Sequence, residues 1–100
     1  MRIAWTDLAL DRVEETALHI AADDPAAALR WVDELFAAAE RLTAFPESGR
    51  LVPELEGRRV RELVYGAYRV FYRVEDVVVI LTVRHASQLI REDEVDEGRT

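Results

Sequence analysis

The sequence predicts an α+β fold, with an N-terminal strand and an antiparallel helical hairpin packed on a twisted antiparallel β-sheet. Two observations carry this prediction. Up to Pro46 the apolar residues recur at spacings of three and four, typical of amphipathic helices, whereas from residue 58 they come in extended, β-rich runs. With 100 residues, 50% of them hydrophobic, the chain can bury one core. We therefore expect a single domain over residues 1–91 and an acidic tail over residues 92–100.

The first helix is predicted from a cap and an apolar stripe. The segment MRIAW is typical of a short strand ending near Trp5, and Thr6 is suited to cap a helix running from about residue 7 to residue 22. The stripe of this helix is formed by Leu10, Val13, Ala17 and Ile20. Asp24 and Pro25 then mark the end of this helix and the start of a second one. Asp24 can cap the new helix, and proline fits its first position.

The second helix continues the same periodicity until Pro46 and Gly49 end it. Its stripe is formed by Leu29, Val32, Leu35, Phe36, Ala39, Leu42 and Thr43. Because the turn between the two helices is so short, they are expected to lie antiparallel as a hairpin. The stretch that follows, FPESGRLVPEL, is interpreted as a connector to the sheet. Ser48 within it has no histidine and acid nearby that would make it a nucleophile.

Three β-rich runs follow, over residues 60–65, 68–74 and 77–84. They are separated by Gly66-Ala67 and Glu75-Asp76, and connections of two residues imply antiparallel neighbours. With a two-residue turn at Glu75-Asp76, the last two runs pair in a fixed order. Residues 69, 71 and 73 then lie opposite Thr82, Ile80 and Val78, and residues 68, 70, 72 and 74 lie opposite Val83, Leu81, Val79 and Val77.

This pairing separates two faces of the sheet. The face of Tyr68, Val70, Tyr72 and Val74 is apolar and is expected to receive the helices. Charged and apolar side chains share the other face, which is therefore expected to be a docking surface. Its members are Arg69, Phe71, Arg73, Ile80 and Arg84.

The facing of Arg61 stays open at this stage. A strict two-residue turn at Gly66-Ala67 places Glu62 beside Arg69 and sends Arg61 to the core face, where an unpaired guanidinium is costly. A longer loop or a bulge reverses that assignment.

Basic side chains and one histidine are the candidates for a site. Arg69 is either an exposed arginine paired with Glu62 or a contact for an anion or a partner. His85 is either a surface residue or a general acid or base. His19, on the first helix, is interpreted as structural. No histidines and acids stand at ligand spacing and no glycine-rich phosphate loop is present, so neither a metal nor a cofactor is expected.

The charge distribution bears on the partner. The net charge is −7, and all 13 basic residues are arginine. Four arginines against ten acids give residues 1–49 a charge of −6, eight against five give residues 50–91 a charge of +3, and one against five gives residues 92–100 a charge of −4. We therefore expect a local basic surface without direct sequence-specific DNA binding. There is no cysteine and no long apolar segment, so a cytoplasmic protein that does not enter the membrane is expected.

Taken together, several stretches resemble the RelE/ParE superfamily of type II toxin–antitoxin toxins, closest to its ParE, or plasmid-stabilisation, branch. The resemblance covers about residues 1–90. Its most specific part is GAYRVFYRV followed by VILTVRH, and it is supported by FPESGR and VPEL. It implies a helical hairpin on a twisted antiparallel sheet. It also implies a cognate antitoxin with a DNA-binding N-terminal fold and a disordered C-terminal segment that wraps and neutralises the toxin.

The resemblance leaves two activities and one inactive alternative. ParE-like members inhibit DNA gyrase and are not known as hydrolases, whereas RelE-like members cut messenger RNA on the ribosome. Arg69 falls on the arginine of the family's YR motif, and Arg84 and His85 fall where ribonuclease members place basic or histidine groups. The absent lysines, Glu62 at a position that tends to be basic in RelE ribonucleases, and the acidic chain favour the ParE activity. The third alternative is a member that only binds its antitoxin.

In the favoured interpretation no catalytic residue is expected. The ribonuclease alternative would use Arg69, Arg84 and His85. In either case the expected partner-binding residues are Arg61, Arg69, Phe71, Arg73, Arg84 and His85. The acidic chain predicts a toxin–antitoxin complex held mainly by apolar contacts and a few arginine–carboxylate pairs.

Overall fold

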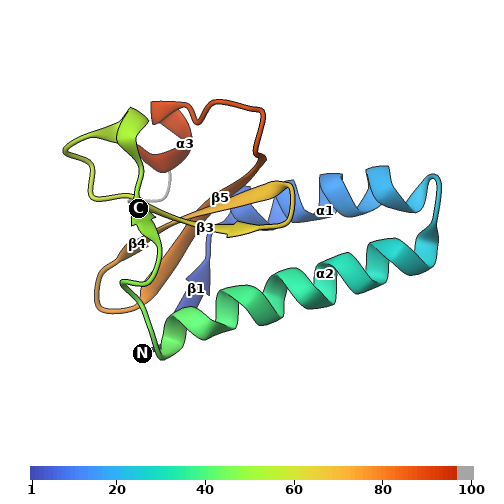
Figure 1. Ribbon diagram of the computed structural model, residues 1–100, viewed down its shortest axis with the longest axis horizontal. Coiled ribbons are helices and arrows are strands. Elements are labelled where there is room, and N and C mark those ends of the chain that lie inside the picture. Colours follow the sequence, from blue (N-terminus) through green and yellow to red (C-terminus); the bar gives the residue numbers. More distant parts are fainter. Residues whose placement is uncertain (97–100) are drawn as a thin grey trace.

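The computed structural model describes residues 1–96 and has two helices on one side of a five-stranded sheet (Figure 1). The strands are β1 (Ile3–Trp5), β2 (Arg50–Leu51), β3 (Arg61–Tyr65), β4 (Tyr68–Val74) and β5 (Val78–His85). The helices are α1 (Asp7–Ala21), α2 (Pro25–Glu40) and the short α3 (Glu92–Asp96), with 3₁₀ turns at Arg41–Thr43 and Pro53–Leu55. Within residues 1–96 no helix is both long enough and apolar enough to cross a lipid bilayer.

The predicted caps start both long helices. The Thr6 hydroxyl accepts a hydrogen bond from the N–H of Ala9 at 3.0 Å and donates one to the carbonyl of Leu81 at 2.8 Å. The same side chain therefore starts α1 and fastens it to β5. Asp24 accepts a hydrogen bond from the N–H of Ala27, and Pro25 takes the first position of α2, so the predicted restart is confirmed.

The sheet has the order β1-β5-β4-β3-β2. The predicted α+β fold is confirmed, with one addition: the sheet is mixed, because β1 pairs in parallel with β5 while the other pairs are antiparallel. The two helices form the crossover that carries the chain from β1 back to the sheet. Within the predicted connector, Arg50 and Leu51 form the short edge strand β2.

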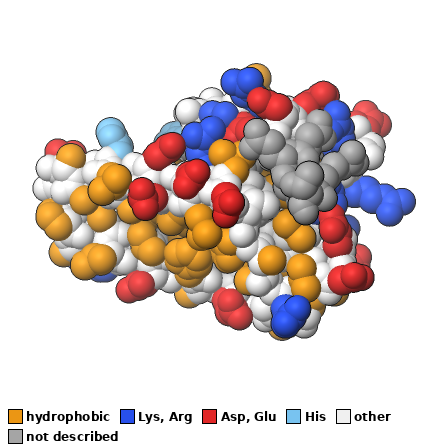
Figure 2. All heavy atoms as spheres, turned by 180° about the vertical axis from the view of Figure 1, so that it is seen from behind, with side chains coloured by type: hydrophobic (Ala, Val, Ile, Leu, Met, Phe, Trp, Pro, Cys, Tyr) orange, Lys and Arg blue, Asp and Glu red, His pale blue; other side chains and the backbone are white. Residues whose placement is uncertain are grey.

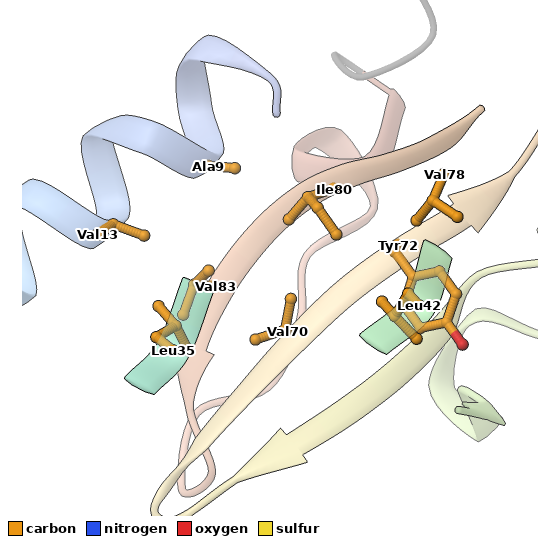
Figure 3. Close-up of a cluster of buried hydrophobic side chains, with 9 residues drawn as sticks. All are labelled: Ala9, Val13, Leu35, Leu42, Val70, Tyr72, Val78, Ile80 and Val83. Atoms are coloured by element: carbon orange, nitrogen blue, oxygen red, sulfur yellow. The ribbon is translucent and has the colours of Figure 1, made fainter. Parts of the chain in front are cut away.

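The main core lies between the helices and the side of the sheet that faces them, which we call the helix face (Figure 3). Leu35 and Leu42 point onto the sheet, where they meet side chains of β4 and β5. Each large side chain removed from water here contributes roughly 1.5–3 kcal/mol. The buried members are Ala9, Val13, Leu35, Leu42, Val70, Tyr72, Val78, Ile80 and Val83.

Two leucines of the predicted stripes are exposed, which corrects their assignment. Leu10 of α1 is 44% exposed and Leu29 of α2 is 70% exposed, whereas the neighbouring Ala9 and Ala28 are buried. Val13, Leu35, Ala39 and Leu42 of the predicted stripes are buried, so the correction applies to the first turns of the two helices, where alanines let the helices approach closely. Figure 2 shows apolar side chains gathered over the half of the molecule that holds the hairpin.

The predicted pairing of β4 with β5 is wrong in register. The connection spans residues 75–77, so Val74 pairs with Val78 and Tyr72 with Ile80. A bulge then places an extra residue, Leu81, on β5, after which Phe71 pairs with Thr82. The predicted helix face of β4 is confirmed. On β5, however, Val79 and Leu81 turn to the other side of the sheet instead of facing the helices, and Ile80, predicted on that other side, is buried on the helix face.

A second, smaller core covers that other side. The segment after β2 and the chain end around α3 pack together there, as Figure 1 shows beside the edge of the sheet. The buried members are Val52, Leu55, Val60, Phe71, Leu81, Ile90 and Val95. The expected solvated tail is therefore corrected for residues 92–96, where α3 buries Val95 and Glu94; residues 97–100 lie outside the described part of the chain.

Candidate partner-binding surface

Five polar side chains and Phe71 occupy the side of the sheet opposite the helices, which we call the arginine face. The polar members are Glu62, Arg69, Arg73, Thr82 and Arg84. The sequence predicted an open docking surface here, and that exposure is wrong: Arg69 is only 8% exposed and Phe71 is fully buried. The second core covers them, because Leu81 and Val79 face this side and need apolar partners.

Arg69 is held between two carboxylates. Its Nε donates to Glu62 Oε2 at 3.1 Å, and its two terminal nitrogens donate to the carboxylate of Glu54 at 3.1 and 3.2 Å. The guanidinium also lies 4.7 Å from the centre of the Phe71 ring. The predicted pair with Glu62 is therefore confirmed. Burial alone would lower the pKa of Arg69, but the hydrogen bonds to Glu54 and Glu62 raise it, and the same contact lowers the pKa of Glu54.

Arg84 is bound by an acid from the chain end. Its Nε and Nη2 donate to the carboxylate of Glu94 at 3.0 and 2.7 Å, and the Thr82 hydroxyl donates to the same group at 3.1 Å. Burial would raise the pKa of Glu94, but the hydrogen bonds from Arg84, the Arg91 backbone and Thr82 lower it. The Glu94 hydrogen bond raises the pKa of Arg84. The carboxylate of α3 thus occupies the position at which an external anion would meet Arg84.

Arg73 is the least satisfied member of the arginine face. Its Nη2 approaches the carbonyl of Arg58 at 3.5 Å, and its Nη1 lies 3.8 Å from Glu75 with no hydrogen bond among the described residues. The three arginines therefore differ: two are tied to buried or half-buried carboxylates, and the third has only long contacts.

The question about Arg61 is settled by the turn. Tyr65 pairs with Tyr68, so Gly66-Ala67 is a strict two-residue connection and Arg61 lies on the helix face opposite Tyr72. Its guanidinium is not stranded, because Nη1 donates to the carbonyls of Gly49 and Glu47 at 2.7 and 3.2 Å. This contact also gives the segment FPESGR a structural role.

Gly49 in that segment has no room for a side chain. Its N–H donates to the buried Tyr72 hydroxyl at 2.8 Å, and an added Cβ would stand 2.5 Å from both that hydroxyl and the carbonyl oxygen of Glu62. The close approach of two backbones therefore requires glycine here. It fixes the loop before β2 against the sheet.

His85 lies on the opposite side of the sheet from Arg69 and Arg84. It pairs with Tyr68 on the helix face, with ring centres 5.4 Å apart, whereas Arg69 pairs with Arg84 on the arginine face. The backbone N–H of Ser87 donates to His85 Nδ1 at 3.1 Å, and the Ser87 hydroxyl lies 2.7 Å from the same nitrogen. His85, Arg84 and the exposed His19 line one pocket of about 420 Å³, from which Arg69 is absent. The three residues of the ribonuclease alternative are thus not brought together.

Sequence reasoning missed the two acids that complete the arginine face. Glu54 lies in VPEL and Glu94 in the acidic chain end, and neither position carries a local signal of its partner. Only the excess of arginines over acids within residues 50–91 pointed to a need for further carboxylates. Within residues 1–96, no three histidine, cysteine or acidic residues are placed to hold a metal ion.

Comparison with known proteins gives a family match over most of the chain. Residues 3–90 match the family model described as "ParE toxin of type II toxin-antitoxin system, parDE". A relative, the candidate toxin Y4kP of Sinorhizobium fredii (strain NBRC 101917 / NGR234), is 43% identical over 91 residues, which cover 87% of this chain and 90% of the relative.

Two solved structures share the fold. One, described as the chromosomal ParDE TA system from P. aeruginosa, has a TM-score of 0.71 at 23% identity and covers 85% of this chain and 95% of that one. The other is the toxin–antitoxin complex RelBE2 from Mycobacterium tuberculosis, with a TM-score of 0.57 at 24% identity, covering 84% of this chain and 95% of that one. At these identities the likeness shows the fold alone.

Proposed function

Because this chain belongs to the ParE toxin family of type II toxin–antitoxin systems, we propose that it inhibits DNA gyrase by binding, without cleaving a substrate, and that a cognate antitoxin neutralises it. The observation that carries the proposal is that the basic residues are paired with acids or lie on opposite sides of the sheet. Arg69 is hydrogen-bonded to Glu62 and Glu54, Arg84 is hydrogen-bonded to Glu94, and His85 points from the opposite side of the sheet. Cutting RNA requires free groups that converge on one phosphate.

The antitoxin is proposed to have a DNA-binding N-terminal fold and a disordered C-terminal segment that wraps this chain in the cytoplasm. The solved relatives named above are described as toxin–antitoxin systems, and exposed leucines such as Leu18 and Leu29 offer apolar area to such a segment. Contacts of this kind predict a complex that survives high salt, and dissociation at moderate salt would contradict it. Binding through Arg61, Arg69, Phe71, Arg73, Arg84 and His85 stays a prediction. For the buried members it requires the second core to open.

The test is gyrase supercoiling with the purified full-length chain, with and without antitoxin. We expect supercoiling to stop as the toxin is added and to recover when the antitoxin is added. Unchanged supercoiling at every dose of a chain that halts growth in cells would overturn the proposal.

A ribosome-dependent ribonuclease is the second candidate, favoured only by the pocket that Arg84 and His85 share. It predicts transcript cleavage in cells, which Arg84→Ala would abolish. The absence of cleavage products with the wild-type toxin would reject it. A chain that neither halts growth nor affects gyrase, yet binds the antitoxin, would be an inactive member.

A further inference from the structure

Two arginines near the short edge strand β2 lack the carboxylate partners that their neighbours have. Between residues 50 and 91 the other arginines lie within 4 Å of a described acid: Arg50, Arg58, Arg69, Arg73, Arg84 and Arg91. Within residues 1–96, Arg61 donates only to backbone carbonyls, and the Arg59 guanidinium makes neither a hydrogen bond nor an ion pair. Both side chains line the same pocket, and they leave two cationic groups available to a ligand.

Arg59 is also the one described residue other than glycine in a left-handed backbone conformation, with φ 57°. A side chain in this region is strained by contact between its Cβ and the backbone, and glycine avoids that contact, as Gly57 does at φ 85° two residues earlier. No contact of the guanidinium within the described chain offsets the strain. A strained residue without an internal partner is a reason to look for an external one.

Two pockets meet at this residue. The first, of about 450 Å³, is mainly apolar and is formed by the end of β2 and the segment that connects β2 to β3; it is lined by Leu51, Val52, Pro53, Leu55, Glu56, Gly57, Arg59 and Val60. The second, of about 430 Å³, is lined by Glu47, Leu51, Arg59, Arg61 and Val74. They share Leu51, which is 57% exposed, and Arg59. We call the pair the Leu51–Arg59 site.

We propose that the Leu51–Arg59 site binds a segment of the antitoxin in which an apolar side chain stands next to a carboxylate. The apolar side chain enters the first pocket, and the carboxylate binds Arg59 and Arg61 in the second. An extended segment fits because the two pockets lie on either side of an exposed edge strand, where neighbouring side chains of a peptide diverge. The acids Glu47 and Glu56 line the site without pairing with Arg59, so Glu47 opposes the incoming carboxylate.

This inference rests on the proposed antitoxin and is tested by the affinity of the full-length chain for that antitoxin, measured by calorimetry. Arg59→Gly removes the guanidinium at a backbone position that glycine prefers. We expect it to raise Tm while weakening binding at least tenfold, a combination that a merely structural arginine would not give. Arg59→Glu should weaken binding further, and Glu47→Gln should strengthen it. Arg2→Glu makes the same charge change at the opposite edge of the sheet and should leave the affinity unchanged.

The outcomes separate this inference from the proposed function. If the wild-type chain binds no antitoxin, the proposed function fails and the inference fails with it. If the wild-type chain binds but Arg59→Glu and Leu51→Asp bind equally well, only the site assignment is overturned. A loss of gyrase inhibition in Arg59→Glu with unchanged antitoxin affinity would also overturn it, since the site would then serve the target.

Discussion

The two sides of the sheet are both buried, but they are buried by different means. The helix face is closed by two long helices mainly through apolar side chains, whereas the arginine face is closed by short segments that bring carboxylates to arginines. An apolar contact tolerates replacement by another apolar group of similar volume. A buried ion pair does not tolerate the loss of one partner, because the other charge is then left unpaired in the protein interior, where water does not solvate it. The two faces should therefore respond differently to mutation and to pH.

The largest effect is expected on the arginine face. Arg69→Leu leaves the buried Glu62 with only the exposed Arg50 as a partner, and we expect it to lower the free energy of unfolding by roughly 3–5 kcal/mol. The double variant Glu62→Leu with Arg69→Leu should recover much of that loss, because neither member of the buried pair is then left without its partner. Urea unfolding measures both. A double variant no more stable than Arg69→Leu would show that the charge itself is not what makes this face sensitive.

On the helix face, Leu35→Ala is expected to cost roughly 2–4 kcal/mol through the cavity it leaves. The same substitution at Leu29, on the same helix but 70% exposed, should change stability by less than about 0.5 kcal/mol. Thermal unfolding of the two variants compares them directly. Equal losses would mean that α2 packs on the sheet by a different stripe.

The contact between the loop before β2 and the sheet is tested by Gly49→Ala. The new methyl group would meet the Tyr72 hydroxyl and the Glu62 carbonyl at 2.5 Å, so we expect a loss of roughly 1–3 kcal/mol. Gly57→Ala measures a different effect, the strain of a left-handed backbone at φ 85°, because its Cβ position is open. Unfolding in urea that is unchanged by Gly49→Ala would contradict the close approach.

The smallest expected effect depends on pH. The pKa of Glu94 is lowered from its ordinary value of 4.5, so its contacts stabilise the fold above that pH and are lost as the pH falls through the lowered value. We expect Glu94→Gln to cost roughly 1–2 kcal/mol at about pH 7 and progressively less in acid. Stability measured along a pH series tests the sign. A variant that differs from the wild type equally at all pH values would exclude this origin.

Sequence patterns predicted the helix face better than the arginine face. Thr6, Asp24 and Pro25 marked the helix starts because capping is a local property. The alternation of β4 gave its two faces correctly, since polar and apolar residues alternate there. The run VVVILTV on β5 has no such alternation. The three-residue connection and the bulge at Leu81 could therefore not be predicted from the order of its residues.

The candidate surface was only partly predictable, because some of its residues come from segments without a regular sequence pattern. The pairing of Glu62 with Arg69 followed from the strand register, which a two-residue turn fixes. Glu54 and Glu94 reach the same face from 15 and 10 residues away from their arginines, in segments without strand periodicity. The covering of a surface by such segments depends on tertiary packing, which the order of residues in β4 and β5 does not contain.

The parallel placement of β1 sets the order in which the fold can be completed. The hairpins α1–α2 and β4–β5 join neighbours in the chain, but Thr6 and Leu81, which meet beside β1, are 75 residues apart. Closing so long a loop is slow, so β1 is expected to dock late. Until it does, β5 is an edge strand that can pair with another chain. The three residues Ile3–Trp5 therefore cover the long edge of β5, and only the short strands β1 and β2 then remain at the edges of the sheet.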